Sequence, residues 1–327
     1  MHSADISNVK ESFFSRLGMN KKLRVDFITA CVAITIIILI SLLIPNFMTF
    51  NNIINLLEQF TTIGTLSIGL TLVMIVGGID LSMPFVLISS ACVGARHMAD
   101  GGSILEGILL MLLVGVVFGT INGIAIAKFK MIPFIVTFSM MMIAEGFAVA
   151  FTNSKSIFGL PSDFLALGGR IGEVIPIPVL MVVILAIIAT IFLSKTRHGR
   201  IYYMIGISED TARVCGINTT LYKFSAYLLS GLLAAIAGII VTARISMAGP
   251  TMVSDTTIMD TVSGCVIGGA SLNGGKGKIV PSLIGALFIV CITNCTNLLG
   301  VSYYASTTIK GILICVIIGL DVIRSKY

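Results

Sequence analysis

The stretch IPIPVLMVVILAIIATIFL, from Ile175 to Leu193, decides what kind of fold this chain adopts. Its 19 residues include no charged side chain. Crossing the hydrocarbon core of a bilayer takes roughly 20 apolar residues in an α-helix. The stretch therefore predicts a transmembrane helix, and the remaining sequence extends that prediction.

The whole chain is strongly apolar. Of its 327 residues, 56% are hydrophobic and 11% are charged, and the mean hydropathy is +1.06. A soluble domain carries about 25% charged residues, so lipid is the expected main solvent. The net charge of +6 fits cytoplasmic loops that collect Lys and Arg, and we expect no nucleic-acid partner. Seven cysteines without a C-x-x-C pair and three separated histidines predict neither a disulfide framework nor a metal site.

Further apolar segments are candidates for membrane spans. The third segment, 84–99, and the eighth, 258–272, are short. Each borders a glycine pair, Gly77-Gly78 and Gly268-Gly269 respectively. Such interruptions are typical of helices that are broken inside the membrane, with a tight turn between two full helices as the alternative. The ten segments are 26–45, 52–76, 84–99, 104–127, 132–151, 175–193, 223–245, 258–272, 279–299 and 305–323.

Basic residues predict how these spans are oriented. If the N-terminus is cytoplasmic, the inner segments hold fifteen of the 21 Lys and Arg residues, whereas the outer loops hold Lys155 and Arg170. This bias predicts an all-α polytopic membrane protein with about ten transmembrane helices, some of them broken, and both termini in the cytoplasm. The inner segments are 1–25, 77–83, 128–131, 194–222, 273–278 and 324–327, and the span-bearing domain covers 26–323.

The long inner segment contains a pattern for a short helix. Within KTRHGRIYYMIGISEDTARVCGINTTLYK, residues 195 to 223, Ser208 is a suitable N-cap and two acidic residues follow it in the first turn. Gly216 suits the left-handed backbone that ends such a helix. An amphipathic helix over 208–215 could enter a groove on a cytoplasmic partner. The alternative is a solvated connector between two spans.

The same segment resembles a known coupling loop. Asp210-Thr211-Ala212-Arg213-Val214-Cys215-Gly216 is similar to the E-A-A-x-x-x-G pattern of ABC importer permeases, with Asp for Glu and Thr for the first Ala. The chain further resembles the ribose-type (carbohydrate uptake 2) permease family along nearly its whole length. The supporting stretches are Gly77-Gly-Ile-Asp-Leu-Ser82, Pro133-Phe-Ile-Val-Thr137, Thr196-Arg-His-Gly-Arg200, Gly216-Ile-Asn218, Ser230-Gly-Leu-Leu233 with Ala237-Gly238, and the turn from Ile267 to Gly277.

This resemblance implies a bacterial inner-membrane permease subunit for a small sugar or sugar-like solute. It also implies two cytoplasmic ABC ATPase subunits, a periplasmic solute-binding protein and a second permease subunit, in a homodimer or a heterodimer. ATP and Mg²⁺ would bind to the partner ATPase, with no cofactor on this chain and no catalytic residues in it. The residues that match the coupling pattern, and would contact the ATPase, are Asp210, Ala212, Gly216 and Ile217.

Polar and ionisable side chains inside predicted spans are costly, which makes them candidates for a translocation pathway. Neutral donors and acceptors with some aromatic surface suit a hydroxyl-rich solute, although hydrogen bonds between helices are an equal alternative. Asp80 could instead cap the helix that begins near Pro84. Lys310 is expected to pair with an acid from another span, and Glu58 and Asp321 with water. The pathway candidates are Asp80, Asn122, Phe134, Thr137, Asn294 and Asn297.

The glycine-rich stretch VIGGASLNGGKGK, residues 266–278, superficially suggests a phosphate-binding loop. It departs from the Walker A spacing, and Gly277 takes the place of the Ser or Thr that holds magnesium. We therefore predict a tight cytoplasmic turn.

An ion-coupled secondary transporter remains as the alternative function, although it would not need a coupling-type loop. An intramembrane enzyme is disfavoured because no histidine lies well inside a predicted span.

Overall fold

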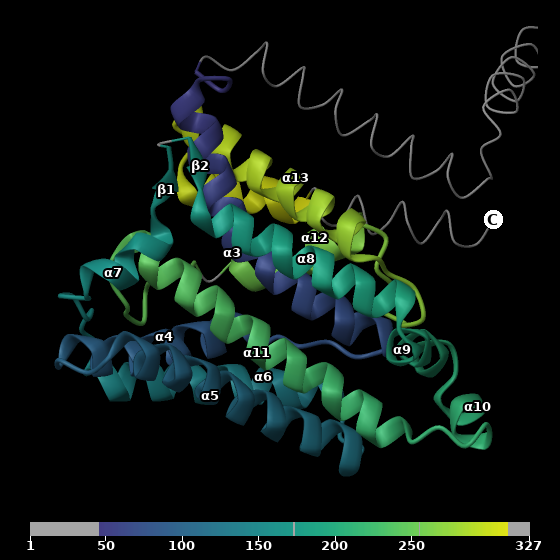
Figure 1. Ribbon diagram of the computed structural model, residues 1–327. Coiled ribbons are helices and arrows are strands. Elements are labelled where there is room, and N and C mark those ends of the chain that lie inside the picture. Colours follow the sequence, from purple (N-terminus) through teal and green to yellow (C-terminus); the bar gives the residue numbers. More distant parts are fainter. Residues whose placement is uncertain (1–45, 173, 255, 313–327) are drawn as a thin grey trace, which may run out of the picture.

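The computed structural model describes residues 46–312, except 173 and 255 (Figure 1). The predicted first span, 26–45, lies outside these residues, as do the terminal segments 1–25 and 324–327 with Asp321. The predicted last span is described from its start to residue 312, and residues 303–312 are helical.

Six helices among the described residues are long and apolar enough to cross a membrane. This confirms a polytopic, mainly helical membrane protein. The helix Ile104–Gly123 continues into a π-helical turn, Ile124–Lys128, which extends that span. The six are α3 (Phe50–Ile75), α5 (Ile104–Gly123), α6 (Pro133–Thr152), α8 (Ile177–Lys195), α11 (Thr219–Ile245) and α13 (Ile279–Leu298).

The third and eighth predicted spans form shorter helices, α4 (Met83–Ala99) and α12 (Thr257–Ile267). The prediction 258–272 was too long at its C-terminal end. The helix stops at Ile267 because Gly269 adopts a positive φ of 82°, which an ordinary side chain rarely accepts. A Cβ on Gly268 would also collide with Pro281 and Ser282 at the start of α13, so this glycine permits the two helices to approach closely.

The inner segment 194–222 is more ordered than a connector. It contains α9 (Arg197–Ile207) and α10 (Glu209–Val214). The outer segment contains the short elements α7 (Ser162–Leu165), η2 (Ala166–Gly168), β1 (Arg170–Ile171) and β2 (Ile175–Pro176), and the two strands pair antiparallel.

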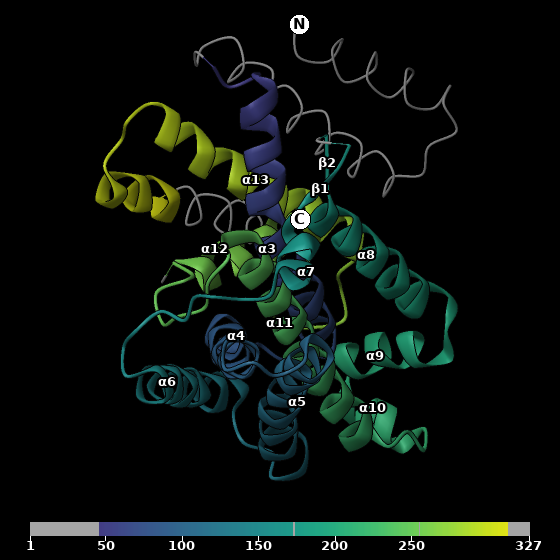
Figure 2. The ribbon, with the colours of Figure 1, turned by 60° about the vertical axis from the view of Figure 1, so that its left-hand side comes forward.

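The core forms around α3 and α11, which are the two most buried of the long helices. Figure 2 shows α3 between α13 and α8, while α4, α5 and α6 gather beyond α11. Gly115 of α5 and Gly231 of α11 face each other so closely that a Cβ on either would meet the other's carbonyl oxygen. Small residues at such crossings let membrane helices pack backbone to backbone. By contrast, α5, α6 and α8 direct many apolar side chains outward.

The loops separate into two groups, one at each end of the bundle. At one end the Gly275 amide donates to the carbonyl of Ile75 at 2.9 Å, and α9 packs on both segments. At the other end Ile157 and Ala248 form a β-bridge, and the β1–β2 hairpin lies beside α3 (Figure 1). Gly77, α9 and the turn 273–278, from three segments predicted to be cytoplasmic, therefore meet at one end of the bundle. We call this the inner end, after the predicted orientation, and the opposite end the outer end.

Candidate functional site

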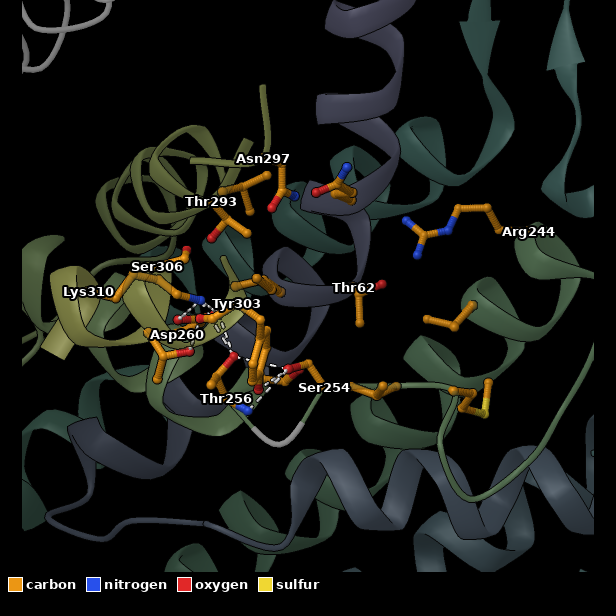
Figure 3. Close-up of a pocket in the computed structure, with 18 residues that line it drawn as sticks. Thr62, Arg244, Ser254, Thr256, Asp260, Thr293, Asn297, Tyr303, Ser306 and Lys310 are labelled. Carbon is orange, nitrogen blue, oxygen red and sulfur yellow. Dashed lines mark hydrogen bonds and ion pairs between the residues drawn. The ribbon is translucent and has the colours of Figure 1, made fainter. Parts of the chain in front are cut away.

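A polar cavity of about 380 Å³ lies among the helices (Figure 3), and its described lining residues include none from α9 or α10. Three long helices form its walls. The outer half of α3 contributes Thr62, the last turns of α11 contribute Arg244, and the last turns of α13 contribute Thr293 and Asn297. Residues 252–254 and Thr256, together with α12 and the helix that begins at Tyr303, complete it. Its volume lies within the range of about 300–1,000 Å³ of small-molecule sites.

A buried ion pair forms one side of this cavity. The ammonium of Lys310 lies 2.9 and 3.1 Å from the two carboxylate oxygens of Asp260, and 3.5 Å from the hydroxyl of Thr256. Both charged side chains are buried. Such a pair is tolerated only when the two charges stay together, because desolvation is costly. The sequence predicted that Lys310 would pair with an acid of another span, and Asp260 on α12 is that acid.

A second polar group lies at the outer margin of the cavity. Arg170 of β1 donates from Nε and Nη2 to one carboxylate oxygen of Glu58, at 3.1 and 2.9 Å, and Arg244 donates to the main-chain carbonyl of the same residue. The expectation that Glu58 is paired with water was therefore wrong. A long-range fold contact, which the sequence does not encode locally, brings Arg170 to it.

The pathway candidates separate into distinct environments. Asn297 lines the cavity. Asn294, three residues earlier, instead exchanges two hydrogen bonds of 2.9 Å with Asn52 of α3. Thr137 is buried, and its hydroxyl donates a hydrogen bond to the main-chain carbonyl of Pro133, four residues earlier in α6, at 2.9 Å. Phe134 lies on the exposed face of α6, where its ring stacks on Phe138.

Asp80, which precedes α4, and Asn122, near the end of α5, belong to the same buried hydrogen-bond network. The Asp80 carboxylate accepts from the amide and hydroxyl of Ser82, at 3.0 and 2.6 Å, and from the hydroxyl of Ser230 at 2.7 Å. Asn122 donates to Ser82 at 3.0 Å, while its Oδ1 has no hydrogen-bond partner among the described residues. Asp80 therefore orders the backbone that leads into α4. It does not cap the helix as the alternative expected, because Ser82 occupies the N-cap position and, among the described residues, no side chain accepts a first-turn amide of α4.

The predicted short helix in the inner segment is confirmed as α10. The hydroxyl of Ser208 accepts the Thr211 amide at 3.2 Å, and Gly216 ends the helix with a φ of 78°. Asp210 is 93% exposed, whereas Ala212 is buried beneath the helix. These two residues therefore differ in exposure: Asp210 is on the surface, where it forms an exposed ion pair with Arg213 at 3.6 Å, and Ala212 is packed beneath α10, which contacts α9 and α11.

Glu209 fastens α10 to the first turns of α11. Its carboxylate accepts from Thr219 at 3.1 Å, from Arg213 at 2.8 Å and from the ammonium of Lys223. Burial opposes ionisation of Glu209, but the hydrogen bonds and positive charges around it prevail and hold its pKa below the ordinary value of 4.5. Sequence reasoning assigned this acid only to the helix start, because its partners Thr219 and Lys223 are recognised only once α11 folds back.

Gly206, near the end of α9, packs against two glycine-bearing segments. A Cβ on Gly206 would collide with the Ile75 carbonyl at the end of α3 and with the Gly275 amide of the following turn. A Cβ on Gly274 would likewise come within 2.8 Å of the Cα of Gly77 and of the carbonyl oxygen of Gly206. We call Ile75, Gly77, Gly206, Gly274 and Gly275 the glycine junction. The unusual density of glycine in 77–78 and 274–277 was the sequence signal for it, but Gly206 itself stands in an unremarkable context.

Comparison with known proteins places the chain in a family. Residues 52–318 match the family described as "Branched-chain amino acid transport system / permease component". Among curated relatives, the ribose import permease protein RbsC of Bacillus subtilis (strain 168) is 38% identical, over 88% of this chain and 89% of that protein. RbsC of Escherichia coli (strain K12) is 36% identical, over 88% and 91%. The D-allose transport system permease protein AlsC of the same strain is 32% identical, over 90% of each. No solved structure matches the chain.

Proposed function

The chain belongs to this family of transport permease components, and from that premise we propose the details of how it serves ATP-driven sugar uptake. It is a multi-pass inner-membrane permease subunit of a binding-protein-dependent sugar importer, as its ribose and allose relatives indicate. ATP is hydrolysed in a separate subunit, not by this chain. The proposal concerns the pathway, the contact with the ATPase and the assembly.

The observation that carries the proposal is the position of two features at opposite ends of the same helices. An exposed surface around α10 occupies the inner end, and the polar cavity occupies the outer half. Ile207 and Val214 on this inner surface are 75% and 88% exposed, beside the exposed Asp210. Exposed apolar side chains on a surface that also carries the coupling-type sequence support a protein contact there. We assign that contact to the ABC ATPase, with Asp210 and Gly216 on the contact surface and Ala212 and Ile217 supporting α10.

The cavity suits a neutral, hydroxyl-rich solute. Its hydroxyl and amide groups include those of Thr62, Thr293, Asn297 and Tyr303, and the charges of Asp260 and Lys310 neutralise each other. Arg244 adds a guanidinium to the lining, next to Glu58, and can donate to the oxygen atoms of a sugar. A small sugar offers many donors and acceptors to such a wall without a net charge to be compensated. The family description mentions branched-chain amino acids, whereas the relatives reported above carry ribose or allose names. We therefore propose a sugar as the solute, with Asn297 as the predicted residue placed to meet it; Asp80, Asn122, Phe134, Thr137 and Asn294 remain further pathway proposals.

The full assembly is proposed on the same basis. Two cytoplasmic ATPase subunits would bind ATP-Mg, and this chain would bind no cofactor itself. A second permease subunit, identical or related, would complete the channel, and lipid would cover the apolar outer faces of α5, α6 and α8. The cavity end would face the periplasmic solute-binding protein, with ten spans and both termini in the cytoplasm.

Reconstitution into proteoliposomes tests this function. The chain is purified with the ATPase that accompanies it, and labelled ribose and allose are supplied with a matching binding protein. We expect uptake that requires ATP on the coupling side and stops when a hydrolysis-deficient ATPase is used. Uptake that follows a proton or sodium gradient without ATP would instead establish the ion-coupled secondary transporter.

A further inference from the structure

We call α9 and α10 together the coupling element. We infer that the coupling element is attached separately to the inner ends of α3, α11 and α13, the three long helices that line the cavity. Tyr203, Gly206 and Glu209 make these attachments and transmit movement through them. They are positioning residues, since none of them touches the solute cavity. The inference rests on the proposed function and goes further by naming the residues that link the ATPase contact to the pathway.

The first attachment is to α3. Gly206 lies directly against the last carbonyl of α3, that of Ile75, with no room for a side chain between them. The same carbonyl accepts the Gly275 amide at 2.9 Å. A displacement of α9 towards this point therefore meets the backbone of α3 itself and not a flexible side chain. Backbone contacts of this kind deform little, because close-packed interiors are stiff.

The second attachment is to α13. The hydroxyl of Tyr203, on α9, donates to the carbonyl of Gly277 at 2.8 Å. Gly277 lies two residues before α13 begins at Ile279. Tyr203 is partly buried, and burial raises the pKa of its hydroxyl, so the group remains a neutral donor. One hydrogen bond thus ties α9 to the turn from which α13 rises.

The third attachment is to α11. Glu209 of α10 binds Thr219 and Lys223, which lie in the first two turns of α11. Arg213 of α10 shares the same carboxylate. These hydrogen bonds and ion pairs hold α10 against the start of α11.

The same three helices reappear at the cavity. The outer half of α3 carries Thr62, the end of α11 carries Arg244, and the end of α13 carries Asn297. The cavity-lining residues include none from α5, α6 or α8. The coupling element is therefore attached to the helices that form the cavity walls. Because a helix is stiff along its length, movement at the three inner ends changes the width of the cavity at the outer ends.

The test measures how much sugar enters per ATP hydrolysed in the reconstituted complex. Tyr203→Phe removes the bond to Gly277 and keeps the ring. Tyr222→Phe is the matched control, because Tyr222 lies in the same region and its hydroxyl makes no hydrogen bond with the described residues. We expect Tyr203→Phe to lower the ratio about two- to tenfold, the effect of one lost hydrogen bond, with ATP hydrolysis maintained and Tyr222→Phe unchanged.

Glu209→Gln and Gly206→Ala extend the test to the other two attachments. Both should lower the same ratio, and Gly206→Ala more strongly, because its methyl group separates α9 from Ile75. An unchanged ratio in Tyr203→Phe and Glu209→Gln would overturn the inference. Parallel loss of hydrolysis and uptake, or loss of the ATPase from the complex, would also overturn it, since the contacts would then serve assembly alone. Absence of ATP-driven uptake in the unaltered protein would contradict the proposed function itself.

Discussion

The two ends of the bundle are built in opposite ways. At the inner end, glycines bring three backbone segments into direct contact and an acidic residue is surrounded by donors. At the outer end, the same helices diverge around a cavity of about 380 Å³ lined with hydroxyls, amides and a buried ion pair. The difference indicates where movement can occur: the inner end resists deformation, whereas the outer end has space that movement can open or close.

The largest effect is expected when the buried ion pair of the outer end is broken. Lys310→Met leaves Asp260 as an uncompensated buried charge, which costs about 3–5 kcal/mol. Thermal unfolding of the purified complex in detergent would measure the loss. Lys195→Met, an exposed lysine at the inner end, is the control and should change little.

The double variant Asp260→Leu/Lys310→Met sharpens this prediction. With both charges removed, most of the stability lost in the single variant should return, because an apolar pair avoids desolvation. A single variant as stable as the unaltered protein would show that the pair is open to water and that the outer end is less enclosed than its geometry indicates.

The next largest effect distinguishes packing from solute contact within one helix. Asn294 bonds to Asn52, and Asn297 faces the cavity. Asn294→Ala removes both bonds to Asn52, which keeps only its bond to the Phe47 carbonyl, and should cost about 1–3 kcal/mol of stability. Asn297→Ala should leave unfolding unchanged and reduce sugar uptake. Uptake that is insensitive to Asn297→Ala would remove this residue from the pathway.

These two asparagines also show the limit of what can be predicted from the sequence. A spacing of three residues predicts one helix face for both, and the apolar runs predicted the spans. The periodicity of one helix cannot say which of two neighbouring residues meets another helix and which meets a cavity, because that depends on how far the helices diverge. For the same reason Ser208 and Gly216 were identified as helix ends from local chemistry, whereas Gly206 and the partners of Glu209 depend on contacts distant in sequence.

A smaller effect is expected at the inner end as the pH falls. The folded protein holds the pKa of Glu209 below its ordinary value of 4.5, so this residue contributes stability that is complete above 4.5. That contribution is lost as the pH falls through the lower pKa of the folded state. Hydrogen exchange of the backbone amides in α10, corrected for the intrinsic rate at each pH, should accelerate over that range. In Glu209→Gln the exchange should be faster at neutral pH and lack this transition.

The smallest effect is expected for Arg170 at the outer margin. Its side chain is 39% exposed and its partner Glu58 is held by Arg244 as well, so solvent screens the pair and a second contact retains α3. Arg170→Gln should therefore change the free energy of unfolding by less than about 1 kcal/mol. A loss comparable with that of Lys310→Met would mean that the β1–β2 hairpin braces the cavity, and the outer end would then be as resistant to deformation as the glycine junction. A small loss, measured beside the large one, would leave the hairpin free to move while the ion pair holds the cavity wall.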